Sequence, residues 1–262
     1  MDDSFTFGFG AESAIYLWPL AAALLCLAAH VAIGYARHAT RAQGMRLRLG
    51  CLAAAALALG TGLWAAMLLG MATAAGYALG YSLWRLAAGW LVAQLAMLFA
   101  LSWAVLWRST PTVLLTALLV GAGMLATEAT LVLAAGLVPG VNWNIALLIV
   151  ALLLAPVGSV AGFFISFVGP GREGAHRKRW RWAAAALVAM AALASQELVM
   201  AAAAVSSQRG SIHMNGVPSA VACLLAAFAV PALLLVMLVD LRVRRARGEG
   251  VDAPRRHRRT RI

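Results

Sequence analysis

The stretch LGCLAAAALALGTGLWAAMLLGMATAA, residues 49–75, contains no charged side chain. A helix needs about 20 consecutive, mostly apolar residues to cross a bilayer, so this stretch is long enough for one crossing. Six more stretches are similarly apolar, and they lie at residues 14–36, 83–107, 112–136, 143–169, 182–206 and 219–241. The sequence therefore predicts an all-α membrane protein, built as a bundle of seven transmembrane helices.

The composition of the whole chain agrees with a membrane protein. Hydrophobic residues make up 63% of the chain, charged residues make up 11%, and the mean hydropathy is +0.87. A water-soluble domain of this length cannot bury that much apolar surface, so the soluble class is excluded. The chain has no HExxH, P-loop, GxSxG or haem-attachment CxxCH motif, and we expect no enzymatic activity.

The arginine and lysine residues predict the orientation in the membrane. Nineteen of the 21 lie in residues 37–48, 108, 172–181 and 242–261, which alternate with loops that carry only Arg85 and Arg209. Basic loops stay in the cytoplasm. We therefore expect a multi-pass protein of the bacterial inner membrane, with a periplasmic N-terminus and a cytoplasmic C-terminus.

Four regions follow from this topology. Residues 1–13 form a short periplasmic N-terminus, residues 14–206 a six-helix membrane domain, residues 207–241 an outer loop and the seventh helix, and residues 242–262 a basic tail. The glycine, proline and arginine content of the tail predicts disorder. A basic cluster beside a membrane helix binds anionic lipid at roughly 1 kcal/mol per residue, so we expect lipid and not nucleic acid as its partner.

Two acidic residues interrupt apolar spans: Glu128 and Glu197. A carboxylate at the centre of a membrane helix costs about 2.5–3.5 kcal/mol, which makes such residues informative. Held neutral by burial, both could bond across helices in a polar layer with Thr130 and Gln196, which would join the helices structurally. A proton-linked switch, a cation ligand and an ordered polar pocket are the functional alternatives, and the sequence leaves the structural role and these three open.

A weak internal repeat places these residues at a common depth. The blocks GTGLWAAMLLGMATA (60–74) and GAGMLATEATLVLAA (121–135) share a Gly-x-Gly pattern, and MAALASQELVMAAAA (190–204) ends in the Met-then-Ala run of the first. Each block follows a basic segment by a similar distance, so all three should lie in the outer half of the membrane. Sites in duplicated membrane bundles lie at the repeat interface, which predicts that the layer faces the bundle interior.

The three blocks resemble the MHYT domain, a bacterial integral-membrane sensor family with three helix pairs. Its pattern reads like G-x-G-x-x-x-Met-His-Tyr-Thr-Gly-Met-x-Ala, and the likeness covers about residues 14–206. This chain has Met67, Glu128 and Gln196 at the histidine positions, while Thr130 and Met71 match the pattern. The resemblance implies a sensor that holds copper and responds to a diatomic gas or to redox state.

Methionine residues are the other candidate ligands. Met67 and Met71 are four residues apart and share a helix face, and Met200 lies in the third block. Thioether sulfur suits Cu(I), so these three residues could form a copper site. Methionine also fills gaps between small residues without any metal. The cofactor is therefore either copper or none.

These observations predict a stand-alone, sensor-like membrane protein that detects a small ligand, a metal or a redox state at the polar layer. Its signal would leave through a cytoplasmic signalling partner or through the basic tail. Two alternatives stay open: a small proton-coupled transporter with Glu128 and Glu197 as carriers, and a structural or assembly subunit of a membrane complex.

Overall fold

The computed structural model describes the backbone of residues 11–42, 44–75, 79–106, 110–138, 140–167, 175–205, 210–213 and 215–246. Side chains are described within these ranges at 16–42, 44–75, 79–103, 115–116, 118–138, 140–158, 179–205, 210–213, 215–244 and 246. The N-terminal region and most of the basic tail therefore lie outside the described residues.

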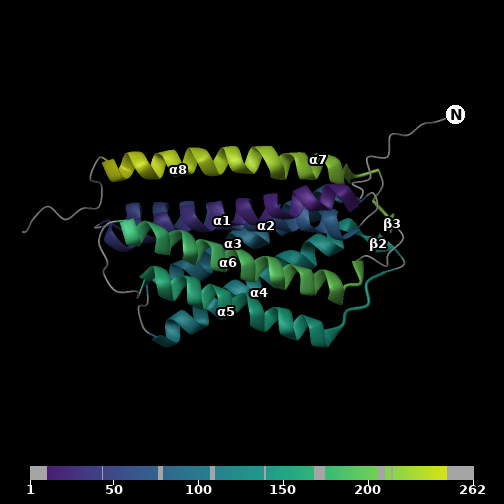
Figure 1. Cartoon of the computed structure of the whole chain (residues 1–262), viewed down its shortest axis with the longest axis horizontal. Helices are drawn as coiled ribbons and strands as arrows, with labels where there is room; N and C mark the ends of the chain where they lie inside the picture. The colour runs from purple at the N-terminus through teal and green to yellow at the C-terminus, as the bar shows by residue number, and fades with distance from the viewer. Residues whose placement is uncertain are drawn as a thin grey trace, which may run out of the picture.

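Long helices lie side by side along one axis (Figure 1). They are α1 (Ala11–Arg41), α2 (Met45–Ala75), α3 (Leu83–Leu106), α4 (Thr110–Ala135), α5 (Ile145–Phe167) and α6 (Ala175–Ala202). A last helical segment consists of α7 (Ser219–Leu224), the π-helical turn η2 (Leu225–Ala229) and α8 (Val230–Ala246), which follow one another without a gap. Each helical segment overlaps one apolar stretch of the sequence.

Two short antiparallel pairings close one end of the bundle, called here the strand end (Figure 1). The strand β1 (Gly80–Tyr81) pairs with β4 (Val217–Pro218), and β2 (Leu137–Val138) pairs with β3 (Gly210–Ser211). The connection between α1 and α2 and the C-terminus of α8 lie at the opposite end, called here the basic end.

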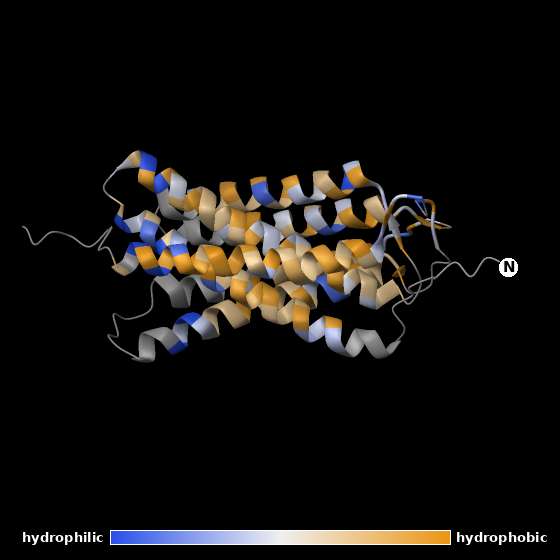
Figure 2. Cartoon of the chain, turned by 90° about the horizontal axis from the view of Figure 1, so that it is seen from above, coloured by the Kyte–Doolittle hydropathy of each residue, from blue (hydrophilic) through white to orange (hydrophobic). Residues whose placement is uncertain are grey.

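Six of the described helical segments are long and apolar enough to cross a membrane, so the prediction of an all-α, multi-pass membrane protein is confirmed. They are Tyr16–Arg41, Met45–Ala75, Leu83–Trp103, Leu118–Ala135, Arg179–Ala202 and Ser219–Arg244. The described apolar part of α5 is shorter, Ile145–Gly158, and a seventh crossing stays a prediction. Hydrophobic residues run along most of the ribbon, and several hydrophilic ones gather at the end opposite the N-terminus (Figure 2).

The helix α2 lies at the centre of the bundle. Its buried residues occur on all sides from Cys51 to Ala75, as expected for an apolar helix that other helices surround. The most extensive helix contacts in the fold join α1 to α2, α3 to α4 and α5 to α6. Helices that are consecutive in the chain thus pack as three pairs.

Each pair is held close by one contact between two small residues. A Cβ atom added to Gly62 would overlap Ala28 of α1, one added to Gly123 would overlap Ala96 of α3, and one added to Gly158 would overlap Ala191 of α6. Small residues let helix backbones approach in a membrane, where packing and not hydrophobic burial drives association.

Candidate polar layer in the bundle interior

The most unusual side chain in the interior belongs to Glu128. It is 0% exposed, and among the described residues neither carboxyl oxygen has a hydrogen-bond partner. Met124 and Leu131 are buried one turn before and after it on α4, so this side of the helix faces the bundle interior. A buried polar group without a partner is costly, which marks the position as a candidate site.

The two nearest hydroxyl groups on α4 bond to their own helix. Thr127 Oγ1 donates to the carbonyl oxygen of Gly123 at 2.8 Å, and Thr130 Oγ1 donates to that of Thr127 at 2.7 Å. Such bonds to a carbonyl three or four residues earlier are the usual way for threonine to satisfy its hydroxyl in a helix. These hydroxyls therefore do not bond to Glu128, and among the described residues its carboxyl group forms none of the expected cross-helix bonds.

Gln196 joins α6 to α2. Its side chain is 2% exposed, and its Nε2 donates to the carbonyl oxygen of Met67 at 3.0 Å. A Cβ atom on Gly70 would overlap the amide of Gln196, so a glycine is needed where this amide reaches α2. Two of the three residues aligned with the histidines of the MHYT pattern, Met67 and Gln196, thus touch each other.

Glu197 does not share this burial. Its side chain is exposed, and its Oε1 accepts a hydrogen bond from Trp18 Nε1 at 3.1 Å. Successive residues of an α-helix point about 100° apart, so Glu197 can face the helix surface while Gln196 points inward. Glu128 and Gln196 are both buried whereas Glu197 is exposed, so the expectation that Glu197 lies in the interior is corrected, and a layer shared by Glu128 and Gln196 stays a prediction.

The candidate metal ligands are all buried. Met67 and Met71 lie on α2 and Met200 lies on α6, two helices that contact each other. Among the described residues, no three His, Cys, Asp or Glu side chains gather in a way that could hold a metal. A site here would therefore depend on thioethers, and copper binding stays a prediction.

Sequence reasoning missed a second polar cluster, between α2 and α3. Trp90 Nε1 donates to Thr61 Oγ1 at 3.2 Å, and the Gln94 amide lies 2.9 Å from the same oxygen. A Cβ atom on Gly60 would be 3.0 Å from that amide. The available signal was Gln94 itself, because a glutamine in an apolar span needs a polar partner.

No protein-family model, curated protein or solved structure matches the chain. A functional interpretation therefore rests on the residues of the chain and on their arrangement in the bundle.

Proposed function

We propose that the chain is a sensor-like protein of the bacterial inner membrane, similar in architecture to stand-alone MHYT domains. It crosses the membrane seven times, with α5 as the fifth crossing, and has a periplasmic strand end and a cytoplasmic basic end. The apolar composition of residues 143–169 and the position of nineteen arginine and lysine residues support this topology.

The close contacts within the helix pairs support a triplicated architecture. On the second helix of each pair, the small contact residue is Gly62, Gly123 or Ala191. Five positions further along the same helices are Met67, Glu128 and Gln196, the residues at the histidine positions of the MHYT pattern. In all three pairs, the candidate site residue therefore lies five positions after the small residue that makes the close helix contact.

The observation that carries the proposal is the buried, unpartnered carboxyl group of Glu128. The described charged side chains of the helices around α4 lie elsewhere: Arg46 and Arg48 start α2, Arg85 starts α3, Arg179 and Arg181 lie early in α6, and Glu197 is exposed. Among the described residues, the helices around α4 therefore supply neither a positive charge nor a hydrogen-bond donor to this carboxyl group. A ligand that brings one of these, such as a metal ion, an ammonium group or a proton, suits the position.

The test measures a conformational change of the protein and the uptake of each stimulus into the same lipid vesicles. Nitroxide labels are placed at Ala42→Cys and Ala246→Cys, at the basic end, after Cys26, Cys51 and Cys223 are replaced by alanine. The purified protein in lipid vesicles is exposed to an external acid shift, to ammonium and to Cu(I) under reducing conditions. A sensor changes the distance between the labels for at least one stimulus, without net uptake into the vesicles.

The control variants locate the response. Glu128→Gln should abolish it, whereas Glu197→Gln should retain it, because Glu197 lies outside the interior layer. Uptake of a probe without a change in the label distance would overturn the proposal in favour of a transporter. No response to any of the three stimuli would also overturn it and would favour an assembly subunit.

A further inference from the structure

The last helical segment contains one turn that is wider than an α-helical turn. In η2 the Val230 N–H donates to the carbonyl oxygen of Leu225, five residues earlier. Pro231 follows directly and explains the wide turn, because proline has no N–H and its ring clashes with the carbonyl of the residue four positions before it. Single π-helical turns of this kind frequently occur at functional sites.

This segment is attached to the rest of the bundle at its strand end. Residues Val217 and Pro218 pair with Tyr81 and Gly80, and the Ser219 N–H donates to the carbonyl oxygen of Leu79 at 2.8 Å. These are backbone contacts, so they set the position and direction in which α7 begins.

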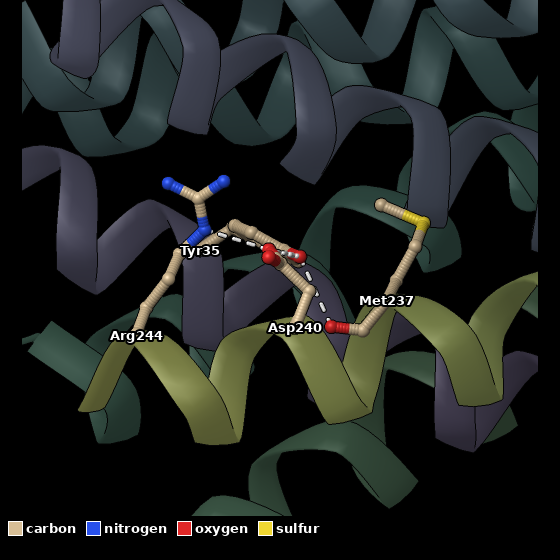
Figure 3. A network of polar contacts seen from close by, with 4 residues as sticks. All are labelled: Tyr35, Met237, Asp240 and Arg244. Carbon is tan, nitrogen blue, oxygen red and sulfur yellow. Dashed lines mark hydrogen bonds and ion pairs between the residues drawn. The ribbon is translucent and has the colours of Figure 1, made fainter. Parts of the chain in front are cut away.

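The segment is attached again at the basic end, by a polar network between α1 and α8 (Figure 3). Tyr35 Oη donates to Asp240 Oδ2 at 2.7 Å and lies 3.0 Å from the carbonyl oxygen of Met237. Arg244 Nε donates to the same Asp240 oxygen at 2.7 Å. Asp240 therefore links Tyr35 of α1 to Arg244 of α8.

The wide turn determines whether both attachments can form at once. An α-helix rotates by about 100° per residue, and a π-helical turn takes up one residue more than an α-helical turn. Converting η2 to α-helix with the strand end fixed would rotate α8 by roughly that angle and turn Asp240 away from Tyr35. The helical segment also changes neighbours here, since α7 and η2 pack on α2 whereas α8 packs on both α1 and α2.

We propose that η2 is a rotational switch, with one position in which the π-helical turn allows the Tyr35–Asp240 contact and a second in which an α-helical turn releases it. The sequence after Ala246 is rich in arginine, and rotation of α8 also rotates Ala246, the residue that precedes it. That this rotation carries a signal rests on the proposed function; the rotation itself does not.

The experiment measures rotation from two neighbouring lipid-facing positions. Leu235 and Val236 are 53% and 67% exposed and point about 100° apart, so a rotation of α8 buries one of them and leaves the other exposed. Single nitroxide labels at these positions report their exposure through collisions with oxygen dissolved in the bilayer. The released protein carries Tyr35→Phe and Pro231→Ala, which remove the hydroxyl contact and the cause of the wide turn.

In the released protein we expect one of the two labels to lose oxygen collisions several-fold. Deleting Ala227 in the same background removes the extra residue of η2, so the original exposure of both labels should return. Unchanged oxygen collisions at both labels in the released protein would overturn the switch. A gain at both labels, or a failure of the deletion to restore the original exposure, would also overturn it.

Pro231→Ala alone provides a second variant, since replacing a proline within a helix favours regular helix. This experiment uses no stimulus. If α8 does not rotate, the switch is refuted, whereas the proposed sensing is tested separately by the response to acid, ammonium and Cu(I).

Discussion

The side-chain amide of Gln196 donates to the backbone oxygen of Met67 across 3.0 Å and so joins α6 to the central helix α2. This contact is possible because Gly70 has no side chain at the point where the amide approaches. The same two helices carry the methionine residues proposed as copper ligands. The contact between Gln196 and Met67 therefore fixes where the amide of Gln196 meets α2.

Gly70→Ala should destabilise the protein by about 1–3 kcal/mol, because the added methyl group overlaps the Gln196 amide in a packed core. Thermal unfolding in mild detergent measures the effect. Gly50→Ala is the matched control on α2, since no atom lies within 4 Å of its Cβ position and alanine favours helix. Equal destabilisation by the two substitutions would contradict the close approach of Gln196.

Glu128→Leu should leave the stability unchanged or increase it, because the carboxyl group has no partner to lose among the described residues. Gln196→Leu should cost about 0.5–1.5 kcal/mol, the usual value of one hydrogen bond. Chemical unfolding of the two variants and of the parent protein ranks the three by their free energy of unfolding. A large loss in Glu128→Leu would show that this side chain holds the bundle together.

Reporter fusions test the proposed orientation. Fusions after residues 42, 110, 176 and 250 should be cytoplasmic, and fusions near residues 79, 139 and 212 should be periplasmic. The reason is the distribution of arginine and lysine between the two sets of loops. A periplasmic reporter after residue 250 would refute this orientation.

The purified protein should carry far less than one copper ion per chain, because none of the residues aligned with the three histidines of the MHYT pattern offers imidazole, the ligand that suits Cu(II). Added Cu(I) should bind weakly under reducing conditions and should be lost in the Met67→Leu, Met71→Leu double variant. Elemental analysis and competition with a Cu(I) chelator measure both quantities. Met190→Leu is the control because Met190 is half exposed on α6. Copper(II) that survives dialysis at one ion per chain would contradict the prediction.

The sequence predicted the helical segments well because apolar stretches of membrane length have few alternative structures. It did not predict which side of each helix faces inward, since spans of alanine and leucine look alike on all sides. Gln196 and Glu197 were both expected in the interior layer, but the structure buries Gln196 and exposes Glu197, which points about 100° away from it around the helix. The sequence also did not predict that Glu128 has no partner among the described residues, or that Thr127 and Thr130 bond to carbonyl groups of their own helix.

The central position of α2 has a consequence for biogenesis. A nascent chain inserts α2 long before α6 and α8 are synthesised, so its future contact surfaces first face lipid. The pairing of Tyr81 with Val217 must likewise wait for residues near the C-terminus. A chain that stops after α6 would insert into the bilayer but leave one side of its innermost helix uncovered, and quality-control proteases that recognise unassembled membrane segments would meet it in that state.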